Sequence, residues 1–190
     1  MDLENPSKYC NSVCSIALLI VNDNKVVKEI SMLINPEDEF GEINSRINKI
    51  TKEMVKDSPT IDKFFNDYKD LFSTYTLVGH NAHYDLTVLA KALYSYGIDL
   101  GEVKYLCTWE LSEKFLTESK SHKLHNLCEE LNYTYDVHEA LSDTHACLFL
   151  YDYLRNNYDI NEDECIKTFK YKRKRKDIIR GENNNDDKTN

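Results

Sequence analysis

Apolar and polar residues alternate along the first part of the chain in a pattern that predicts two neighbouring β-strands. Residues 12–21 and 26–34 are rich in Ile, Val and Leu, and the turn-forming residues Asn22-Asp23-Asn24 separate them. Apolar strands joined by so short a turn usually pair in antiparallel fashion. We therefore predict a β-hairpin, which is closed by Asn35-Pro36.

The middle of the chain predicts a strand, a tight turn and a helix in succession. Residues 75–78 have the composition of a short strand that ends at Gly79, and apolar residues then repeat at helical spacing over residues 86–96 until Gly97 ends the helix. Because strands and helices are interspersed, the pattern indicates an α/β fold. The remaining repeats predict helices at residues 43–55, 61–72, 108–115, 124–131 and 140–154, and a short strand at residues 105–109.

Acidic residues stand at positions that these elements turn toward the interior. Asp2 and Glu4 are two residues apart, so on a strand both side chains point to the same face. Asp85 precedes Leu89 by four residues, and Asp143 precedes Cys147 by four, so each aspartate continues the apolar stripe of its helix. An acidic residue in the first turn also favours helix formation by itself. Asp85 taken alone is therefore open to either interpretation.

The acidic residues taken together indicate a metal site. Several carboxylates that converge on one sheet repel one another unless cations neutralise them. Ligands that are all oxygen suit Mg²⁺ or Mn²⁺ rather than zinc, and two such ions can clamp the attacking and leaving oxygens of a phosphodiester. His138 precedes Asp143 by five residues, and an imidazole there could take the proton of the attacking water.

Composition narrows the class of protein. The 190 residues suffice for one domain, and no run of 18 apolar residues encodes a membrane span. The six cysteines include no CxxC pair, so we interpret them as reduced residues of a cytoplasmic protein rather than as a disulfide framework or zinc site. His122 and His125 are three residues apart and could suggest a metal-binding site. We favour the interpretation that both lie at the solvent-exposed start of a helix.

One predicted helix, at residues 61–72, carries a stripe of aromatic residues. A base-stacking platform would need those rings to be exposed, so we interpret the stripe as part of the core. Its members are Phe64, Phe65, Tyr68 and Phe72.

Charge divides the chain into an acidic body and a basic end. Residues 1–166 hold 15 Lys and Arg against 29 Asp and Glu, whereas residues 167–190 hold 9 against 4. The basic residues are concentrated between Lys170 and Lys176, which could contact phosphates or form a solvated end. We predict one domain at residues 1–160, followed by a disordered tail at 161–190 that is first basic and then rich in Asn and Asp.

Three motifs follow one another along the chain: Asp2-Leu3-Glu4, His80-Asn81-Ala82-His83-Tyr84-Asp85 and His138-Glu139-Ala140-Leu141-Ser142-Asp143. In this order they resemble the motifs of the DEDDh (DnaQ-like) 3′–5′ exonucleases, the family of the DNA polymerase III ε subunit and ribonuclease T. The resemblance covers about residues 1–155 and implies an RNase H-like fold, a five-stranded mixed sheet flanked by helices. It also implies that Asp2, Glu4, Asp85 and Asp143 hold two Mg²⁺ (or Mn²⁺) ions, with His138 as general base.

The chain departs from the family pattern in three places. Asn5 stands where the family usually has Thr, and residues 48–51 read Asn-Lys-Ile-Thr where many members read His-Gly-Ile-Thr. Only Met1 precedes Asp2, so either the sequence starts too late or the first strand is truncated at the N-terminus, which would leave backbone groups of its neighbours without ladder partners. By resemblance, the substrate-binding residues are Asn5, Ile50, Thr51, His80 and Asn81.

The resemblance implies an exonuclease that hydrolyses single-stranded DNA or RNA from its 3′ end. One alternative is a catalytically silent nucleic-acid-binding or interaction module of the same fold, and another is a phosphodiesterase that acts on polyphosphate or on nucleotides. Proofreading members commonly carry a clamp-binding peptide that contains Gln, and this chain has no Gln. A stand-alone enzyme is therefore favoured over a stable polymerase or clamp partner, and the oligomeric state is left open.

Overall fold

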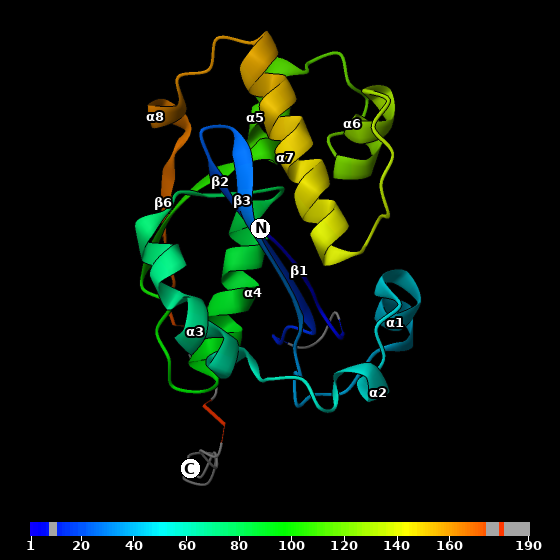
Figure 1. Cartoon of the computed structure of the whole chain (residues 1–190), viewed down its shortest axis with the longest axis vertical. Helices are drawn as coiled ribbons and strands as arrows, with labels where there is room; N and C mark the ends of the chain where they lie inside the picture. Colours follow the sequence, from blue (N-terminus) through cyan, green and yellow to red (C-terminus); the bar gives the residue numbers. More distant parts are fainter. Residues whose placement is uncertain (8–10, 174–178, 181–190) are drawn as a thin grey trace, which may run out of the picture.

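The computed structural model describes residues 1–7, 11–173 and 179–180 (Figure 1). Within them the strands are β1 (Asp2–Glu4), β2 (Ser15–Asn22), β3 (Lys25–Leu33), β4 (Leu77–Gly79), β5 (Glu102–Cys107) and β6 (Lys167–Lys170). The helices are α1 (Glu42–Asn48), α2 (Lys52–Val55), α3 (Ile61–Thr74), α4 (Ala82–Tyr94), α5 (Thr108–Phe115), α6 (Leu124–Glu130), α7 (Ala140–Asn157) and α8 (Glu162–Cys165).

The strands form two three-stranded sheets, and not the expected single sheet of five. In the first sheet β2 lies between β1 and β3, all antiparallel, with Asp2 opposite Ala17 and Glu4 opposite Ser15. In the second sheet β5 pairs parallel with β4 and antiparallel with β6. The predicted hairpin is confirmed as β2–β3, whereas the prediction of one five-stranded sheet is wrong.

The two sheets are separate because β1 is very short. β1 contributes three residues, and the backbone hydrogen bond that reaches β4 runs from the Met1 nitrogen to the Val78 carbonyl oxygen at 2.8 Å. β2 continues past Ala17, the partner of Asp2, to Asn22. A strand needs a ladder of such bonds to join its neighbours into one sheet, and one bond is too few. The shortness of β1 is thus the physical reason for the split.

Alternation along the strands divides the apolar residues between two cores. Leu3 of β1 and Tyr105 of β5 belong to the core that α3 and α4 cover. Leu106, which follows Tyr105, belongs to a second core with α5, α6 and α7. The interpretation of the aromatic stripe on α3 as core is confirmed, because Phe64, Phe65 and Phe72 are buried. Asp2 and Glu4 point to the face opposite Leu3.

The predicted domain boundary at residue 160 is wrong for residues 161–170. These residues form α8 and β6, and β6 extends the second sheet by pairing with β5. Phe169 is 4% exposed and packs in the core with α3 and α4, and Lys170 pairs with Glu102 at 3.0 Å. Residues 174–176 of the predicted basic cluster lie outside the described residues, and so does the Asn/Asp-rich segment.

The sequence also predicted reduced cysteines and no membrane-spanning segment. Four of the described cysteines, Cys107, Cys128, Cys147 and Cys165, are free thiols. None of the helices formed by the described residues combines the length and the apolar character that a bilayer span requires.

A longer first strand should stabilise the protein. We expect four apolar, β-prone residues added before Met1 to raise the melting temperature by several degrees, because they would pair with β2 beyond Ala17 and with β4. Differential scanning calorimetry measures the effect. Four Gly and Ser residues added at the same place are the matched control and should have little effect. Equal melting temperatures for both extensions would contradict this account of the split sheet.

Candidate metal centre

Strand β1 supplies two carboxylates to one face of the first sheet. The alternation that buries Leu3 at 6% exposure turns Asp2 and Glu4 to the opposite face. The end of β1 is held by Cys14, whose backbone N–H donates to the Glu4 carbonyl oxygen at 2.8 Å and whose thiol donates to the same oxygen at 3.3 Å. The Glu4 side chain is therefore carried on a fixed backbone.

A tight turn between β4 and α4 supplies the third carboxylate. A Cβ at Gly79 would lie 3.3 Å from the Met1 carbonyl oxygen and 3.1 Å from the Ala82 Cβ, so a residue without a side chain suits this close approach. Asn81 adopts the left-handed conformation with φ of 65°, and α4 then begins at Ala82. Asp85, in the first turn of α4, is 6% exposed.

The start of α7 supplies the fourth carboxylate and the histidine. The Glu139 side chain caps α7 by accepting from the Leu141 and Ser142 backbone N–H groups at 3.3 and 2.7 Å. Asp143 is then 8% exposed within the first turn. His138 lies before the cap, is exposed, and has a positive φ of 65°.

The structure brings these residues from three separate segments into one cluster. Ligand atoms of Glu4, His138 and Asp143 all lie within 4.8 Å of one another. Asp2 is close enough to Asp85, Asp143 and Glu4 for each of the three charges to raise its pKa. The five residues predicted as catalytic therefore share one site.

Burial makes the charged form of these carboxyl groups costly. Burial, followed by the neighbouring carboxylates, raises the pKa of Asp2 well above its ordinary value, and burial likewise raises that of Asp85. For the same reason the pKa of Glu4 rises to about 7 and that of Asp143 to about 6. The Met1 ammonium group opposes the shifts of Asp2 and Asp85.

The donor set fits a hard divalent cation. Asp85 Oδ2 and Asp143 Oδ2 are buried without a hydrogen-bond partner among the described residues. Buried polar atoms are normally paired, so such orphaned carboxylate oxygens are suited to an ion. Carboxylate oxygens are the ligands that Mg²⁺ and Mn²⁺ prefer.

A rim of polar groups borders the cluster on the side of α1. The Asn5 side chain donates to the Tyr84 hydroxyl at 3.4 Å, and its Oδ1 is buried without a partner among the described residues. Asn44 and Asn48 donate to the Asn5 carbonyl oxygen at 3.2 and 3.1 Å, and a hydrogen bond from Asn48 lowers the pKa of Glu4. The sequence motif indicated position 48 only through its departure from the family pattern.

His80 is held inside the protein by both ring nitrogens. Nδ1 lies 3.0 Å from Thr108 Oγ1, and Nε2 lies 2.8 Å from the His122 carbonyl oxygen. Burial lowers the pKa of His80 to about 4, so its ring is neutral at pH 7. His122 in turn contacts Ser112 at 3.0 Å. This network positions the turn before Asp85, and the sequence did not predict the role of Thr108 or Ser112.

Two further predicted substrate residues differ in exposure. Ile50 is 7% exposed and packs with Cys14 and Val55 in a small core beneath the site. Thr51 is exposed and precedes α2. Lys49, between α1 and Ile50, adopts the left-handed conformation with φ of 60°, at the position where many family members have Gly. The roles of all five predicted substrate residues stay predictions.

Comparison with known families identifies the domain. A family model described as exonuclease (RNase T) matches residues 4–151, which is most of the chain. The chain belongs to this exonuclease family. The match includes Glu4, Asp85, His138 and Asp143, and the resemblance inferred from the motifs is thereby confirmed.

Curated relatives place the exonuclease domain within much longer proteins. DNA polymerase III PolC-type of Bacillus cereus is 25% identical over 145 residues, which are 76% of this chain and 10% of that protein. 3′-5′ exonuclease DinG of Bacillus subtilis is 26% identical over 140 residues, which are 73% of this chain and 15% of that protein. The chain thus spans about a tenth to a seventh of the length of these relatives.

Solved structures share the fold. Exonuclease X in complex with 5′ overhanging duplex DNA aligns with a TM-score of 0.70 and 23% identity, covering 86% of this chain and 94% of that one. The nuclease domain of 3′hExo, a DEDDh family member bound to rAMP, aligns with a TM-score of 0.63 and 13% identity, covering 84% and 86%. The α/β, RNase H-like fold expected from the sequence is confirmed at this level.

The raised pKa values predict that the metal-free protein loses stability as pH rises. In the folded protein the pKa of Glu4 is about 7 and that of Asp143 about 6, both above their ordinary values of 4.5 and 3.8. The folded state therefore binds more protons than the unfolded state across this window, and stability falls from about pH 4 to about pH 7. Melting temperatures measured in chelator at pH 5 and pH 8 should be higher at pH 5.

The substitution Asp85→Asn tests whether repulsion between the buried carboxylates causes this loss of stability at high pH. The substitution removes one of the mutually repelling buried charges, so the metal-free variant should melt several degrees above wild type at pH 8. Saturating Mg²⁺ should stabilise wild type much more than the variant. Asp67→Asn, on the exposed surface of α3, is the control and should match wild type. A variant less stable than wild type in chelator would show that repulsion between the carboxylates is not the main cause of the instability.

Proposed function

We propose that this domain is a metal-dependent exonuclease that hydrolyses nucleic acid from the 3′ end. The observation that carries the proposal is the convergence of Asp2, Glu4, Asp85 and Asp143 on one site whose buried oxygens lack partners among the described residues. Four carboxyl groups in this arrangement destabilise the protein unless a cation offsets their charge. The names of relatives, which include a 3′-5′ exonuclease, support the direction of hydrolysis.

The four carboxylates would hold two Mg²⁺ (or Mn²⁺) ions, which when bound polarise the phosphate and stabilise the charges on the attacking and leaving oxygens. The protein itself contributes by holding the four carboxylate ligands in position. β1 fixes two ligands on one strand, and α4 and α7 each present one carboxylate from a first helical turn. This rigid support keeps the ligands near their working geometry before substrate arrives.

His138 is suited to the proton transfer. It is exposed, and an atom of its ring lies within 4.8 Å of ligand atoms of Glu4 and Asp143. A neutral imidazole ring in this position can accept the proton of the attacking water. The bond that breaks joins phosphorus to the 3′ oxygen of the penultimate nucleotide, and water supplies the hydroxyl group that ends on the released nucleotide.

The rim beside the cluster would bind the terminal nucleotide. The buried Asn5 Oδ1 can accept a hydrogen bond, and the exposed Thr51 hydroxyl can donate one. Asn81 is exposed at the turn before α4, and Tyr84 is 52% exposed beside Asn5, where a base could stack on its ring. The structures of similar proteins with 5′ overhanging duplex DNA and with rAMP support nucleic acid as the substrate class.

The first assay concerns metal dependence and direction. We expect single strands labelled at the 5′ end to shorten progressively, while strands labelled at the 3′ end release mononucleotide at once. Both signals should require Mg²⁺ or Mn²⁺ and disappear in chelator, and Asp85→Asn should abolish them while Asp67→Asn retains them. A folded, metal-loaded protein without turnover on either DNA or RNA would instead indicate a silent binding module.

The second assay concerns His138. Because a general base takes the proton of the attacking water, His138→Ala should slow hydrolysis while leaving metal binding unchanged. The variant should lose about 10²–10⁴-fold in rate. His125→Ala, on the exposed surface of α6, is the matched control. A His138→Ala variant with the wild-type rate would assign His138 a structural role only.

A further inference from the structure

The C-terminal end of α4 holds an arginine from a segment far along the chain. The short segment that contains Arg180, drawn in red in Figure 1, lies at this end, where the Arg180 backbone N–H donates to the Ser95 carbonyl oxygen at 2.7 Å. Ser95 is the C-cap of α4, and the last carbonyl groups of a helix have no partner within it. A positive charge here also suits the negative end of the helix dipole. Arg180 therefore completes the end of α4.

Each nitrogen of the Arg180 guanidinium group has its own acceptor. Nε donates to Ser95 Oγ at 3.2 Å and Nη1 donates to Glu37 Oε2 at 2.8 Å. Nη2 donates to the Pro36 carbonyl oxygen at 2.6 Å, and the Tyr96 ring covers one face of the group, with its centroid 4.8 Å from Cζ. Acceptors spread around a plane, with an aromatic ring against its face, suit Arg rather than Lys. These four contact residues are the α4-end cluster: Pro36, Glu37, Ser95 and Tyr96.

The acceptors of the α4-end cluster are oriented by bonds that do not involve Arg180. The Ser95 hydroxyl donates to the Ala92 carbonyl oxygen at 2.7 Å, so toward Arg180 its Oγ acts as an acceptor. Glu37 adopts the left-handed conformation with φ of 50°, and its backbone N–H donates to Asn35 Oδ1 at 3.0 Å. This conformation is uncommon for a residue with a side chain and is often found where a ligand is held.

Negative charge gathers around the α4-end cluster. The Tyr96 hydroxyl donates to Glu37 Oε2, the oxygen that also accepts from Arg180, at 2.8 Å. Burial, the hydrogen bond to Glu37, and the charges of Glu37 and Asp62 raise the pKa of Tyr96, whereas Arg180 lowers it. Asp62, in the first turn of α3, is therefore close to Tyr96, and its Oδ1 is buried without a hydrogen-bond partner among the described residues. Two carboxylates near one arginine favour a cation in this place.

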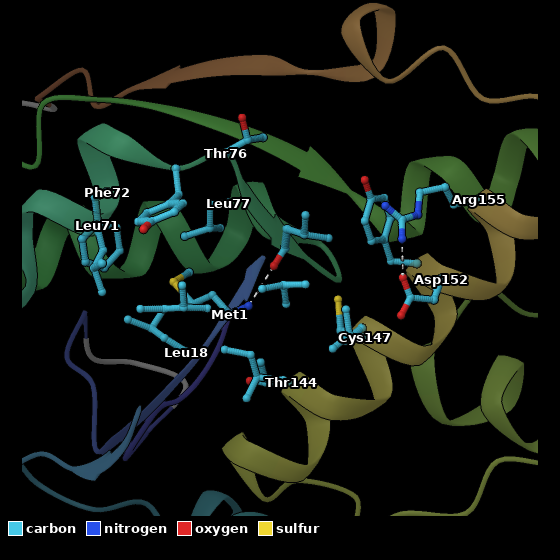
Figure 2. A pocket seen from close by; sticks show the side chains of 17 residues that line it. Met1, Leu18, Leu71, Phe72, Thr76, Leu77, Thr144, Cys147, Asp152 and Arg155 are labelled. Atoms are coloured by element: carbon cyan, nitrogen blue, oxygen red, sulfur yellow. Dashed lines mark hydrogen bonds and ion pairs between the residues drawn. The ribbon is translucent and has the colours of Figure 1, made fainter. Parts of the chain in front are cut away.

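Arg155 shows how a local arginine pair differs from this arrangement. It pairs with Asp152, three residues earlier in α7, at 3.0 Å and donates to Asn24 Oδ1 at 2.7 Å, in both cases through Nη2 (Figure 2). The side chains of Arg155 and Arg180 are similarly covered, at 30% and 32% exposure. Arg180 instead uses three nitrogens and contacts two segments that lie 143 and 85 positions before it.

We propose that the α4-end cluster is a binding site for the guanidinium group of an arginine side chain, with Arg180 as its ligand in the same chain. The bound Arg180 fastens the chain at residue 180 to the end of α4 and to the loop between β3 and α1. Charge-assisted hydrogen bonds supply affinity, and the planar fork with its aromatic face supplies selectivity for Arg over Lys. The proposal does not depend on the nuclease activity.

The site joins two elements that border the metal centre. α4 carries Asp85 in its first turn and ends at the arginine site. The loop after β3 leads into α1, whose Asn48 donates to the Asn5 carbonyl oxygen. An occupied site therefore holds α4 and this loop together at the end of α4 that lies farther along the chain from Asp85.

Removal and rescue test whether the cluster binds arginine. Arg180→Ala in the full chain should lower the melting temperature by several degrees, and N-acetyl-arginine amide should restore it in a saturable manner. The compound should have little effect on wild type, whose site is filled. N-acetyl-lysine amide is the matched control and should bind the variant at least about tenfold more weakly. Equal effects of the two compounds on the variant, or equal effects of the arginine compound on variant and wild type, would overturn the proposal.

A second variant verifies that Glu37 belongs to the site. Glu37→Gln keeps the shape of the acceptor and removes its charge, so it should lower the melting temperature and weaken the rescue in the double variant with Arg180→Ala. Arg46→Ala is the matched control, because Arg46 and Glu42 form an ion pair with side chains 80% and 89% exposed, and it should match wild type. Losses from Glu37→Gln and Arg180→Ala that simply add in the double variant would show that the two residues do not interact and overturn the proposal.

Hydrogen exchange locates the effect of the bound arginine. In Arg180→Ala, backbone amides of residues 92–98 should exchange faster, those of β2 and β3 should not change, and N-acetyl-arginine amide should restore slow exchange. Mass spectrometry of peptic fragments measures this. Unchanged exchange at the end of α4 would overturn the proposal. Analytical ultracentrifugation identifies the source of the ligand: a wild-type dimer that dissociates in Arg180→Ala would assign the bound arginine to a second copy and overturn the choice of the same chain.

Discussion

The structure depends on one short strand that serves both the sheet and the metal site. β1 carries Asp2 and Glu4 on one face, while Leu3 anchors it in the core on the other. The same strand lies between β2 and β4. The hydrogen bond from the Met1 nitrogen to the Val78 carbonyl oxygen connects this end of the chain to β4. The placement of two of the four carboxylates is therefore coupled to the junction between the two sheets.

The second constraint is the cost of burying the four carboxyl groups together. Burial raises the pKa of each group, and the neighbouring charges raise it further, so the site favours either bound protons or bound cations at neutral pH. A protein that only needed stability would place apolar residues at Asp85 and Asp143, which are 6% and 8% exposed. The proposed cation binding would account for these two carboxyl groups in the first turns of α4 and α7.

The sequence predicted much of the site because its signals are local. The spacing of two between Asp2 and Glu4, and the helical stripes that contain Asp85 and Asp143, place all four side chains on inward faces without reference to the rest of the fold. Their convergence is a property of the tertiary structure, and only the family resemblance anticipated it. The network of His80, Thr108 and His122 was not predicted, because residues distant in the sequence form it.

The sheet was predicted less well for a related reason. The one hydrogen bond described between the two sheets joins Met1 to Val78, which are 77 positions apart, and whether two such strands join into one sheet depends on the length of their ladder rather than on composition. β6 contains only one apolar residue, Phe169, among charged and polar neighbours, so periodicity did not reveal it. Only its pairing with β5, which is distant in the sequence, identifies β6 as a strand.

The central claim is that the four carboxylates form a site for two divalent ions, and isothermal titration calorimetry of Mn²⁺ into the nucleic-acid-free protein tests it most directly. The account predicts saturable binding with up to two ions per chain, proton release at pH 6 because the ions displace protons from Glu4 and Asp143, and loss of that binding in Asp85→Asn. Absence of Mn²⁺ binding to the folded wild-type chain, or equal binding to Asp85→Asn, would contradict the account.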